Sequence, residues 1–162
     1  MPDNTPNNPK VVAHIAKAFR FEAERDQAAL SAEWQVIVEF YSVLHWMRAA
    51  CAHIRQERGR QDRSFKKLNL NGHGAFETAM KRLGLPGDVQ DDYIELRDFS
   101  EWARYGIVPE KEITPDVTRK ATARAVALRA WAVGELLNAG YNCTSATPPP
   151  APNPTTPPPL LP

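Results

Sequence analysis

A stretch of twelve residues, from Trp34 to His45, restricts the fold of this chain more than any other feature. Its large apolar and aromatic side chains recur in steps of four, three, four and three, and this period predicts a helix. The stripe consists of Trp34, Val38, Tyr41, His45 and Arg48. It begins with an aromatic ring and ends with an imidazole and a guanidinium, so its polar end is either buried with partners or lines a functional site.

Helical signals also dominate the rest of the chain, and there is no strand-like alternation of useful length and no internal repeat. Thr114-Pro115-Asp116 is a strong helix start, with a hydroxyl cap, a proline at the first position and then an acid. Ser31 is a plausible cap for the long helix, which Gly59 can end. The predicted helices cover 11–29, 32–58, 73–83, 87–105 and 115–139. Short connections between five helices favour an all-α antiparallel bundle.

The two ends of the chain differ from the middle in composition. Residues 1–9 are rich in Asn and Pro, and the last fifteen residues contain nine prolines. Proline lacks the amide donor that helices and sheets need, so the C-terminal segment is predicted to be an extended, disordered tail. We therefore divide the chain into a flexible segment 1–9, a helical bundle 10–140 and a tail 141–162. The tail is either a linker or a ligand for an aromatic-lined groove.

Composition excludes several classes of protein. No apolar run is long enough to span a membrane, and the N-terminal segment does not have the pattern of a secretory signal. Two cysteines are too few for a disulfide framework, and we expect both to be reduced thiols in a cytoplasmic protein. The four scattered histidines show no metal-ligand spacing, so we expect neither a metal site nor a cofactor.

Charge is unevenly distributed, although the net charge is only +1. Residues 55–72 contain six basic and two acidic side chains, a balance of +4, while 88–116 contain nine acidic and three basic ones, a balance of −6. Such opposite regions either face each other, within the chain or across a dimer, or form two separate solvated surfaces. Clustered cations in 55–72 also suit phosphate binding.

Three patterns in order resemble the HEPN superfamily of all-helical domains. The first is Trp34, Phe40-Tyr41 and His45, and the second is His73 at the head of a short helix. The third is a Tyr-x-x-Leu-x-x-x-Ser-x-x-x-Arg-Tyr motif, formed by Tyr93, Leu96, Ser100, Arg104 and Tyr105. The resemblance covers about 70 of the 162 residues. It implies a helical bundle that often dimerises and that binds RNA or a nucleotide in bacterial toxin–antitoxin or phage-defence systems.

Many proteins of this superfamily are metal-independent endoribonucleases, but this chain departs from their catalytic pattern. That pattern has an Arg and a His separated by four to six intervening residues near the start of a late helix, whereas no His follows Arg104. The only such pair, Arg48 and His53, lies inside the long predicted helix, where a spacing of five turns the two side chains about 140° apart. The resemblance therefore supports the fold more than the activity.

The residues with suitable chemistry are His45, His73 and Arg104. Cleavage by attack of a 2′-hydroxyl needs a base, an acid and a cation, and these three side chains could supply them. Substrate contacts are expected from the following side chains: Tyr41, Arg48, Ser100, Tyr105, Arg63, Lys66 and Lys67. The alternative is a buried polar network in which His45 is bonded to Ser100 or to a tyrosine hydroxyl. His14 is expected on the surface of the first helix.

The sequence thus leaves two classes of function open. The first is an RNA- or nucleotide-binding domain, with ribonuclease activity as an extension. The second is a non-catalytic helical module that binds a protein partner, such as an antitoxin-like protein, or a second copy of itself. A small-molecule pocket around Trp34, Tyr41 and His45 is a third, weaker interpretation.

Overall fold

The computed structural model describes residues 8–27, 29–106 and 112–144, and these residues form an all-helical fold. The α-helices are α1 (Pro9–Gln27), α2 (Ala32–Gln61), α3 (His73–Arg82), α4 (Gly87–Tyr105) and α5 (Pro115–Asn138), with a 3₁₀ helix, η1 (Arg63–Lys67), after α2. No described residue belongs to a strand. The predicted all-α bundle is confirmed. Most of the predicted tail and of the N-terminal segment lies outside the described residues. The start of the predicted tail is wrong, because Tyr141 and Cys143 are buried and belong to the core.

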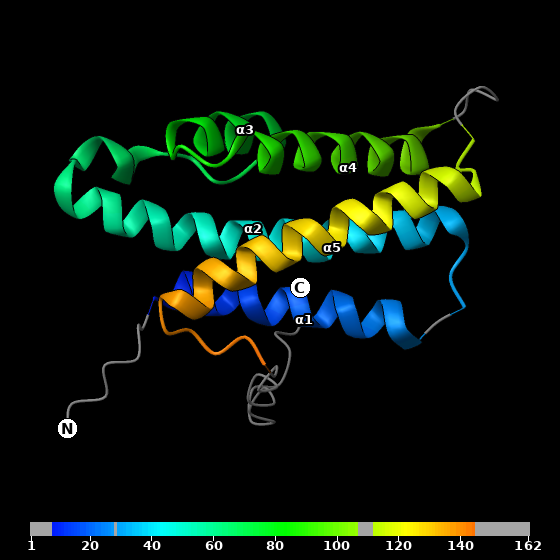
Figure 1. The fold of residues 1–162 in the computed structure, drawn as a ribbon, viewed down its shortest axis with the longest axis horizontal. Helices are drawn as coiled ribbons and strands as arrows, with labels where there is room; N and C mark the ends of the chain where they lie inside the picture. Colours follow the sequence, from blue (N-terminus) through cyan, green and yellow to red (C-terminus); the bar gives the residue numbers. More distant parts are fainter. Residues whose placement is uncertain (1–7, 28, 107–111, 145–162) are drawn as a thin grey trace, which may run out of the picture.

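The long helix α2 is the centre of the bundle (Figure 1). It lies between α1 on one side and the α3–α4 pair on the other, and α5 crosses it obliquely. Consecutive long helices run in opposite directions, whereas α2 and α5 run in the same general direction. Because every other helix surrounds it, α2 presents side chains to several neighbours and can position a site on more than one of its faces.

Burial of the α2 faces forms the core. Phe40, Trp46 and Met47 of α2 are fully buried, and Phe76 from α3 and Tyr93 from α4 pack on the side where these helices meet α2. Each fully buried large apolar side chain contributes roughly 1.5–3 kcal/mol. The apolar residues of the described helices therefore form one continuous core, and Cys51 and Cys143 are both free thiols.

The helix starts follow the local signals in the sequence. The hydroxyl of Thr114 accepts a hydrogen bond from the amide of Val117 at 3.3 Å, with Pro115 at the first helical position. Ser31 caps α2 in the same way, by accepting from the amide of Trp34 at 3.4 Å. Both caps satisfy amides that a helix start leaves without partners.

Gly59 does not end α2, contrary to the prediction. The helix continues to Gln61, and its last turn is closed by the amide of Asp62, which donates to the carbonyl of Arg58. Gly59 is buried, and a Cβ at this position would lie 2.9 Å from Cγ of Lys66. The glycine therefore allows η1 to approach the backbone of α2 closely, which is a packing requirement that a local helix signal does not reveal.

None of the helices among the described residues combines the length and the apolar character needed to cross a bilayer.

Candidate functional site

The stripe on α2 is only partly covered by its neighbours. Trp34, in the first turn, is 59% exposed, so it does not join a pocket with the residues that follow it on the stripe. Val38 and His45 are buried, and Tyr41 and Arg48 are half-buried. The polar end of the stripe is thus the part enclosed by other helices, and it forms the candidate site.

His45 pairs with His14 of α1, and the two Nδ1 atoms are 3.0 Å apart. One ring nitrogen donates and the other accepts, and the rings stack with centroids 5.3 Å apart. Phe21, also on α1, stacks on both His45 and Tyr41. His45 bonds to neither expected partner. The hydroxyls of Ser100 and Tyr93 are buried without a hydrogen-bond partner in the described structure, and the hydroxyl of Tyr41 accepts from Arg104. His14 is half-buried rather than on the surface, because it packs against His45.

Both imidazoles of this pair are neutral at pH 7. Burial is the main cause that lowers the pKa of His14 to about 4, with Arg48 and Lys17 adding positive charge nearby. Burial is also the main cause that lowers the pKa of His45 to about 4, and the positive charges of His14, Lys17 and Arg48 lower it further. A general base works best with a pKa near the operating pH, so His45 is a weak base in the unliganded protein.

Arg104, near the end of α4, reaches across to α2. Its Nη1 donates to the hydroxyl of Tyr41 at 2.8 Å, and its Nε donates to the carbonyl of Ser100 at 3.3 Å. The guanidinium carbon also lies 5.4 Å from the centre of the Tyr41 ring and 5.5 Å from that of Tyr105. Tyr105 is 71% exposed, so this end of the site is open to solvent.

His73 is the first residue of α3, directly after Gly72, whose φ of 75° suits a glycine at this turn. The His73 ring packs at 5.6 Å from Phe40, and its Nδ1 is buried without a hydrogen-bond partner. Burial lowers the pKa of His73, and Arg104 and Arg48 lower it further. Glu101 acts in the opposite direction. His73 is therefore within electrostatic range of both arginines.

Arg48 is within electrostatic range of three histidines, and it lowers the pKa of His14, His45 and His73. Its guanidinium is half-buried, 5.8 Å from the centre of the Phe76 ring, and burial lowers its own pKa. Its Nε is buried without an acceptor, and no described carboxylate lies within ion-pair distance of Arg48.

The structure thus brings most of the predicted site residues to one stretch of α2. We call the set of Tyr41, His45, Arg48, His73 and Arg104 the arginine–histidine cluster. Helices α2, α3 and α4 each contribute to it. Tyr41, Arg48, His73 and Arg104 are half-buried, whereas His45 is buried and pairs with His14 of α1. Ser100 does not join this cluster, because its side chain is fully buried.

The basic residues Arg63, Lys66 and Lys67 belong to a different part of the molecule. They are exposed on η1, at the end of α2 opposite to its start (Figure 1). Lys66 packs on Gly59, which is eighteen residues after Tyr41 on the same helix. At 1.5 Å per residue this separation is about 27 Å, so η1 does not join the arginine–histidine cluster.

Four of the six acidic side chains of α4 are paired with arginines outside the basic region. Arg97 on α4 is in ion-pair contact with Glu77, Asp98 and Glu101. Arg124 on α5 contacts Asp92 at 3.1 Å and Glu95 at 2.6 Å. No ion pair in the described part of the chain joins the basic region 55–72 to the acidic region 88–116. Within one chain, the two regions therefore do not neutralise each other.

Sequence reasoning missed His14 and Phe21, which complete the site from α1. The signal was present, because residues 14, 17 and 21 are spaced by three and four and therefore share one face of the helix. What the sequence does not show is that this face packs on the polar end of the α2 stripe.

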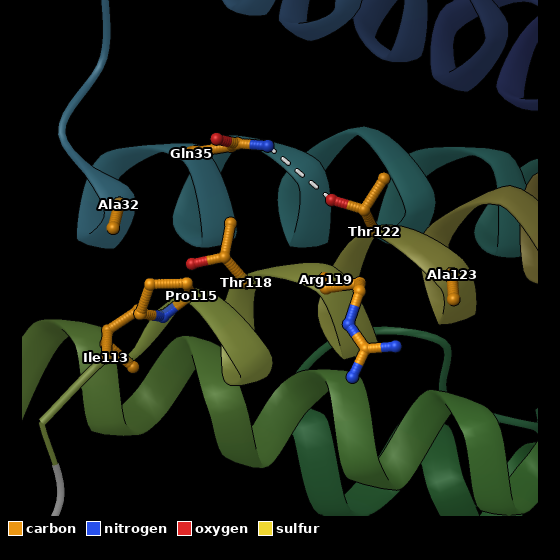
Figure 2. Close-up of a pocket in the computed structure, with 8 residues that line it drawn as sticks. All are labelled: Ala32, Gln35, Ile113, Pro115, Thr118, Arg119, Thr122 and Ala123. Atoms are coloured by element: carbon orange, nitrogen blue, oxygen red, sulfur yellow. Dashed lines mark hydrogen bonds between the residues drawn. The ribbon is translucent and has the colours of Figure 1, made fainter.

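Two further hollows lie away from the cluster. A groove of about 760 Å³ lies between the starts of α2 and α5 (Figure 2). Figure 2 shows the 3.5 Å hydrogen bond from Gln35 to Thr122 beside it. Its lining consists of Ala32, Gln35, Ile113, Pro115, Thr118, Arg119, Thr122 and Ala123. The second is a polar cavity of about 40 Å³, lined in part by Glu22, Glu39 and Arg129.

Buried acids around the smaller cavity hold helices together. Glu22 of α1 accepts from Nε1 of Trp46 at 2.7 Å and from Nε of Arg129 at 2.6 Å. Glu39 accepts from the hydroxyl of Thr122 at 2.9 Å, and burial raises the pKa of Glu39. Among the described residues, no three His, Cys, Asp or Glu side chains are grouped so that they could hold a metal ion.

Comparison of the chain with protein-family models, with curated proteins and with solved structures finds no match.

Proposed function

We propose that this protein is a HEPN-like domain that binds RNA or a nucleotide through the arginine–histidine cluster. In this proposal the guanidinium groups of Arg48 and Arg104 hold a phosphate, and His73 and the hydroxyl of Tyr41 border it. The family assignment, and with it a bacterial toxin–antitoxin or phage-defence setting, depends on the sequence motifs. The inference that the ligand carries a phosphate depends on the residues of the arginine–histidine cluster.

The observation that carries the proposal is a pair of half-buried guanidiniums without an anion. No described carboxylate lies within ion-pair distance of Arg48 or Arg104, and Nε of Arg48 is buried without an acceptor. A partly buried cation is costly when it is unpaired. A phosphate oxygen would supply both the missing charge and the missing acceptor, and arginine matches phosphate geometry well.

The neutral histidines favour binding over cleavage in the free protein. His45 has a pKa of about 4 and its Nδ1 is engaged by His14, so at pH 7 it is a weak base and carries no proton to donate as an imidazolium. Ribonuclease activity would require the ligand itself to raise the pKa values of His45 and His73. We therefore propose that the site binds RNA or a nucleotide, and RNA cleavage is measured separately.

The test is the affinity for a short RNA and for a mononucleotide at low salt, measured with wild-type protein and with Arg48→Gln and Arg104→Gln. Arg20→Gln is a matched control, because Arg20 is an exposed cation on α1 paired with Glu24. The proposal expects about a tenfold loss for each site variant and less than a twofold loss for the control. Equal affinities in all four proteins would overturn it.

Cleavage is tested in the same preparation with a labelled RNA in the presence of a chelator. Activity that disappears in His45→Gln and His73→Gln would extend the proposal to a metal-independent ribonuclease. Activity that persists in both variants would belong to another site or to a contaminant.

One observation supports a second candidate, a non-catalytic interaction module. The 760 Å³ groove at the starts of α2 and α5 is lined mainly by apolar and small side chains and contains none of the predicted catalytic residues. The two candidates differ in solution. Absence of RNA binding at low salt, together with a mass that increases with protein concentration, would favour the interaction module.

A further inference from the structure

Six basic side chains meet where α2, η1 and α3 end. They are Arg58, Arg63, Lys66, Lys67, Lys81 and Arg82, and we call this set the basic end. All six are exposed residues, and none is in ion-pair contact with a described carboxylate. They come from three elements, and the fold brings them closer together than their positions along the chain require.

Specific contacts hold the basic end together. The guanidinium carbon of Arg58 lies 5.7 Å from the centre of the Phe65 ring on η1. The same guanidinium would be 3.4 Å from a Cβ at Gly84, just after α3. Gly84 has a φ of 64°, which a glycine adopts readily. The turn after α3 and the close approach at Gly59 therefore bring the three helix ends to one surface.

The acids in this region are already engaged. Asp62 accepts hydrogen bonds from the amide and the hydroxyl of Ser64, both at 2.8 Å. Glu57 pairs with Arg60 at 2.8 Å. Glu57 is thus paired outside the basic end, whereas Asp62 keeps its charge and is in electrostatic range of Arg82. Six cations against this one carboxylate leave the basic end with a net positive charge for a partner outside the chain.

We propose that the basic end is a second contact for the phosphate backbone of a nucleic-acid strand, which also occupies the arginine–histidine cluster. This inference rests on the proposed function and adds that the ligand is a chain of several nucleotides rather than a single one. It also commits to the backbone phosphates as the recognised groups, because exposed lysines and arginines read charge and not sequence.

Helix α3 connects the two contacts. His73, its first residue, borders the cluster, and Arg82, its last residue, belongs to the basic end. Nine residues at 1.5 Å per residue separate them by about 14 Å, and η1 is about 27 Å from Tyr41 along α2. At about 3.4 Å per stacked nucleotide these separations correspond to roughly four to eight nucleotides. A dinucleotide is thus too short for both contacts, whereas a 12-mer reaches them.

The experiment compares a labelled dinucleotide with a single-stranded 12-mer, in RNA and DNA forms, over a series of salt concentrations. The variant is Arg63→Gln/Lys66→Gln/Lys67→Gln. The control, Arg20→Gln/Arg119→Gln/Lys120→Gln, also removes three exposed cations, all of which pair with carboxylates on α1 or α5. Circular dichroism and the thermal midpoint establish that both variants are folded.

For the basic-end variant we expect the 12-mer affinity to fall about tenfold or more at 50 mM salt, in both RNA and DNA. The slope of log affinity against log salt should decrease by about 2, since each phosphate contact on a single strand contributes about 0.7. The dinucleotide affinity should stay within twofold of wild type, and the control should match wild type with both ligands.

The outcomes separate this inference from the proposed function. If the 12-mer binds the basic-end variant as tightly as wild type while Arg48→Gln weakens the dinucleotide, the second contact does not exist and the proposed function stands. If the basic-end variant weakens the dinucleotide as much as the 12-mer, the two contacts are not separate and the inference is overturned. If wild type binds neither ligand at low salt, both proposals fail.

Discussion

Arg104 Nη1 donates a hydrogen bond to the hydroxyl of Tyr41 at 2.8 Å, and this contact ties the end of α4 to the middle of α2. The two residues are 63 positions apart in the chain. Tyr41 holds the guanidinium by its hydroxyl and by its ring face, so Arg104 has a fixed position without a carboxylate. A cation that is positioned but not neutralised is the arrangement expected of an anion site.

Tyr41→Phe should loosen Arg104 while leaving the ring stacked on Phe21, 5.5 Å away. Loss of one hydrogen bond to a charged group should reduce the free energy of unfolding by about 1–2 kcal/mol and weaken RNA binding severalfold. Urea unfolding and fluorescence anisotropy measure the two effects. Tyr105→Phe is the control, because Tyr105 is exposed and contacts Arg104 only by its ring. Equal effects of the two substitutions would show that the Tyr41 hydroxyl has no special role.

The His14–His45 pair should make stability depend on pH. Free histidine has a pKa near 6.5, but in the folded protein the pKa of each ring is about 4. Between these values the unfolded chain binds more protons, so the free energy of unfolding should decrease as the pH falls from 6.5 towards 4. At pH 7 and above this penalty is absent.

The measurement for this pair is urea unfolding at pH 7.0, 6.0 and 5.0, with His14→Gln/His45→Gln as the comparison. We expect wild type to lose about 2 kcal/mol more than the variant between pH 6.0 and 5.0, because each of the two rings contributes about 1 kcal/mol over this step. Other titrating groups, including Glu39, are shared by both proteins and cancel in the difference. Parallel pH profiles would contradict the assigned pKa values.

Glu22→Ala should be strongly destabilising, because it removes the acceptor shared by Trp46 and Arg129. Breaking a buried ion pair from one side typically costs about 3–5 kcal/mol, and the lower end applies here because Arg129 is partly exposed. Glu24→Ala, which removes an exposed pair with Arg20, should cost less than 1 kcal/mol. A Glu22→Ala protein that unfolds at the same urea midpoint as Glu24→Ala would refute the structural role given to Glu22.

Two glycines, one in the first turn of α3 and one just after α3, should respond in opposite ways to alanine. Gly84 has a φ of 64°, where an alanine costs about 1 kcal/mol, and its Cβ would also approach Arg58. Gly74 is inside α3 with open space around it, so Gly74→Ala should stabilise the protein by about 0.5–1 kcal/mol. Thermal unfolding of both variants checks the pair, and a stabilising Gly84→Ala would argue against the turn described for the end of α3.

Local signals were sufficient to predict the five α-helices, but not the end of α2 or the 3₁₀ helix η1. The cap at Thr114 with Pro115, and the cap at Ser31, act within a few residues, so their hydrogen bonds can be inferred from the sequence. The same holds for the direction of the α2 stripe, because helical pitch fixes which side chains share a face.

Packing between distant segments was not predictable in this way. Pitch places Trp34 on the stripe but does not determine whether a neighbour covers that turn, and Trp34 is exposed. The partner of His45 is His14 on α1, not Ser100 on α4, because the arrangement of three helices decides which side chain it meets. Gly59 is predicted to end the helix because a glycine often does so. Its actual role is to let Lys66 approach, and this contact between segments is not visible in the sequence.

The central claim is that an anion binds between Arg48 and Arg104, next to His73, and the pKa of His73 is its most direct measure. Both arginines lower that pKa in the unliganded protein, so a bound phosphate should raise it by offsetting their charge. The measurement is an NMR titration of the His73 imidazole with and without saturating dinucleotide. We predict a higher pKa in the complex, and an unchanged pKa at saturation would contradict the account.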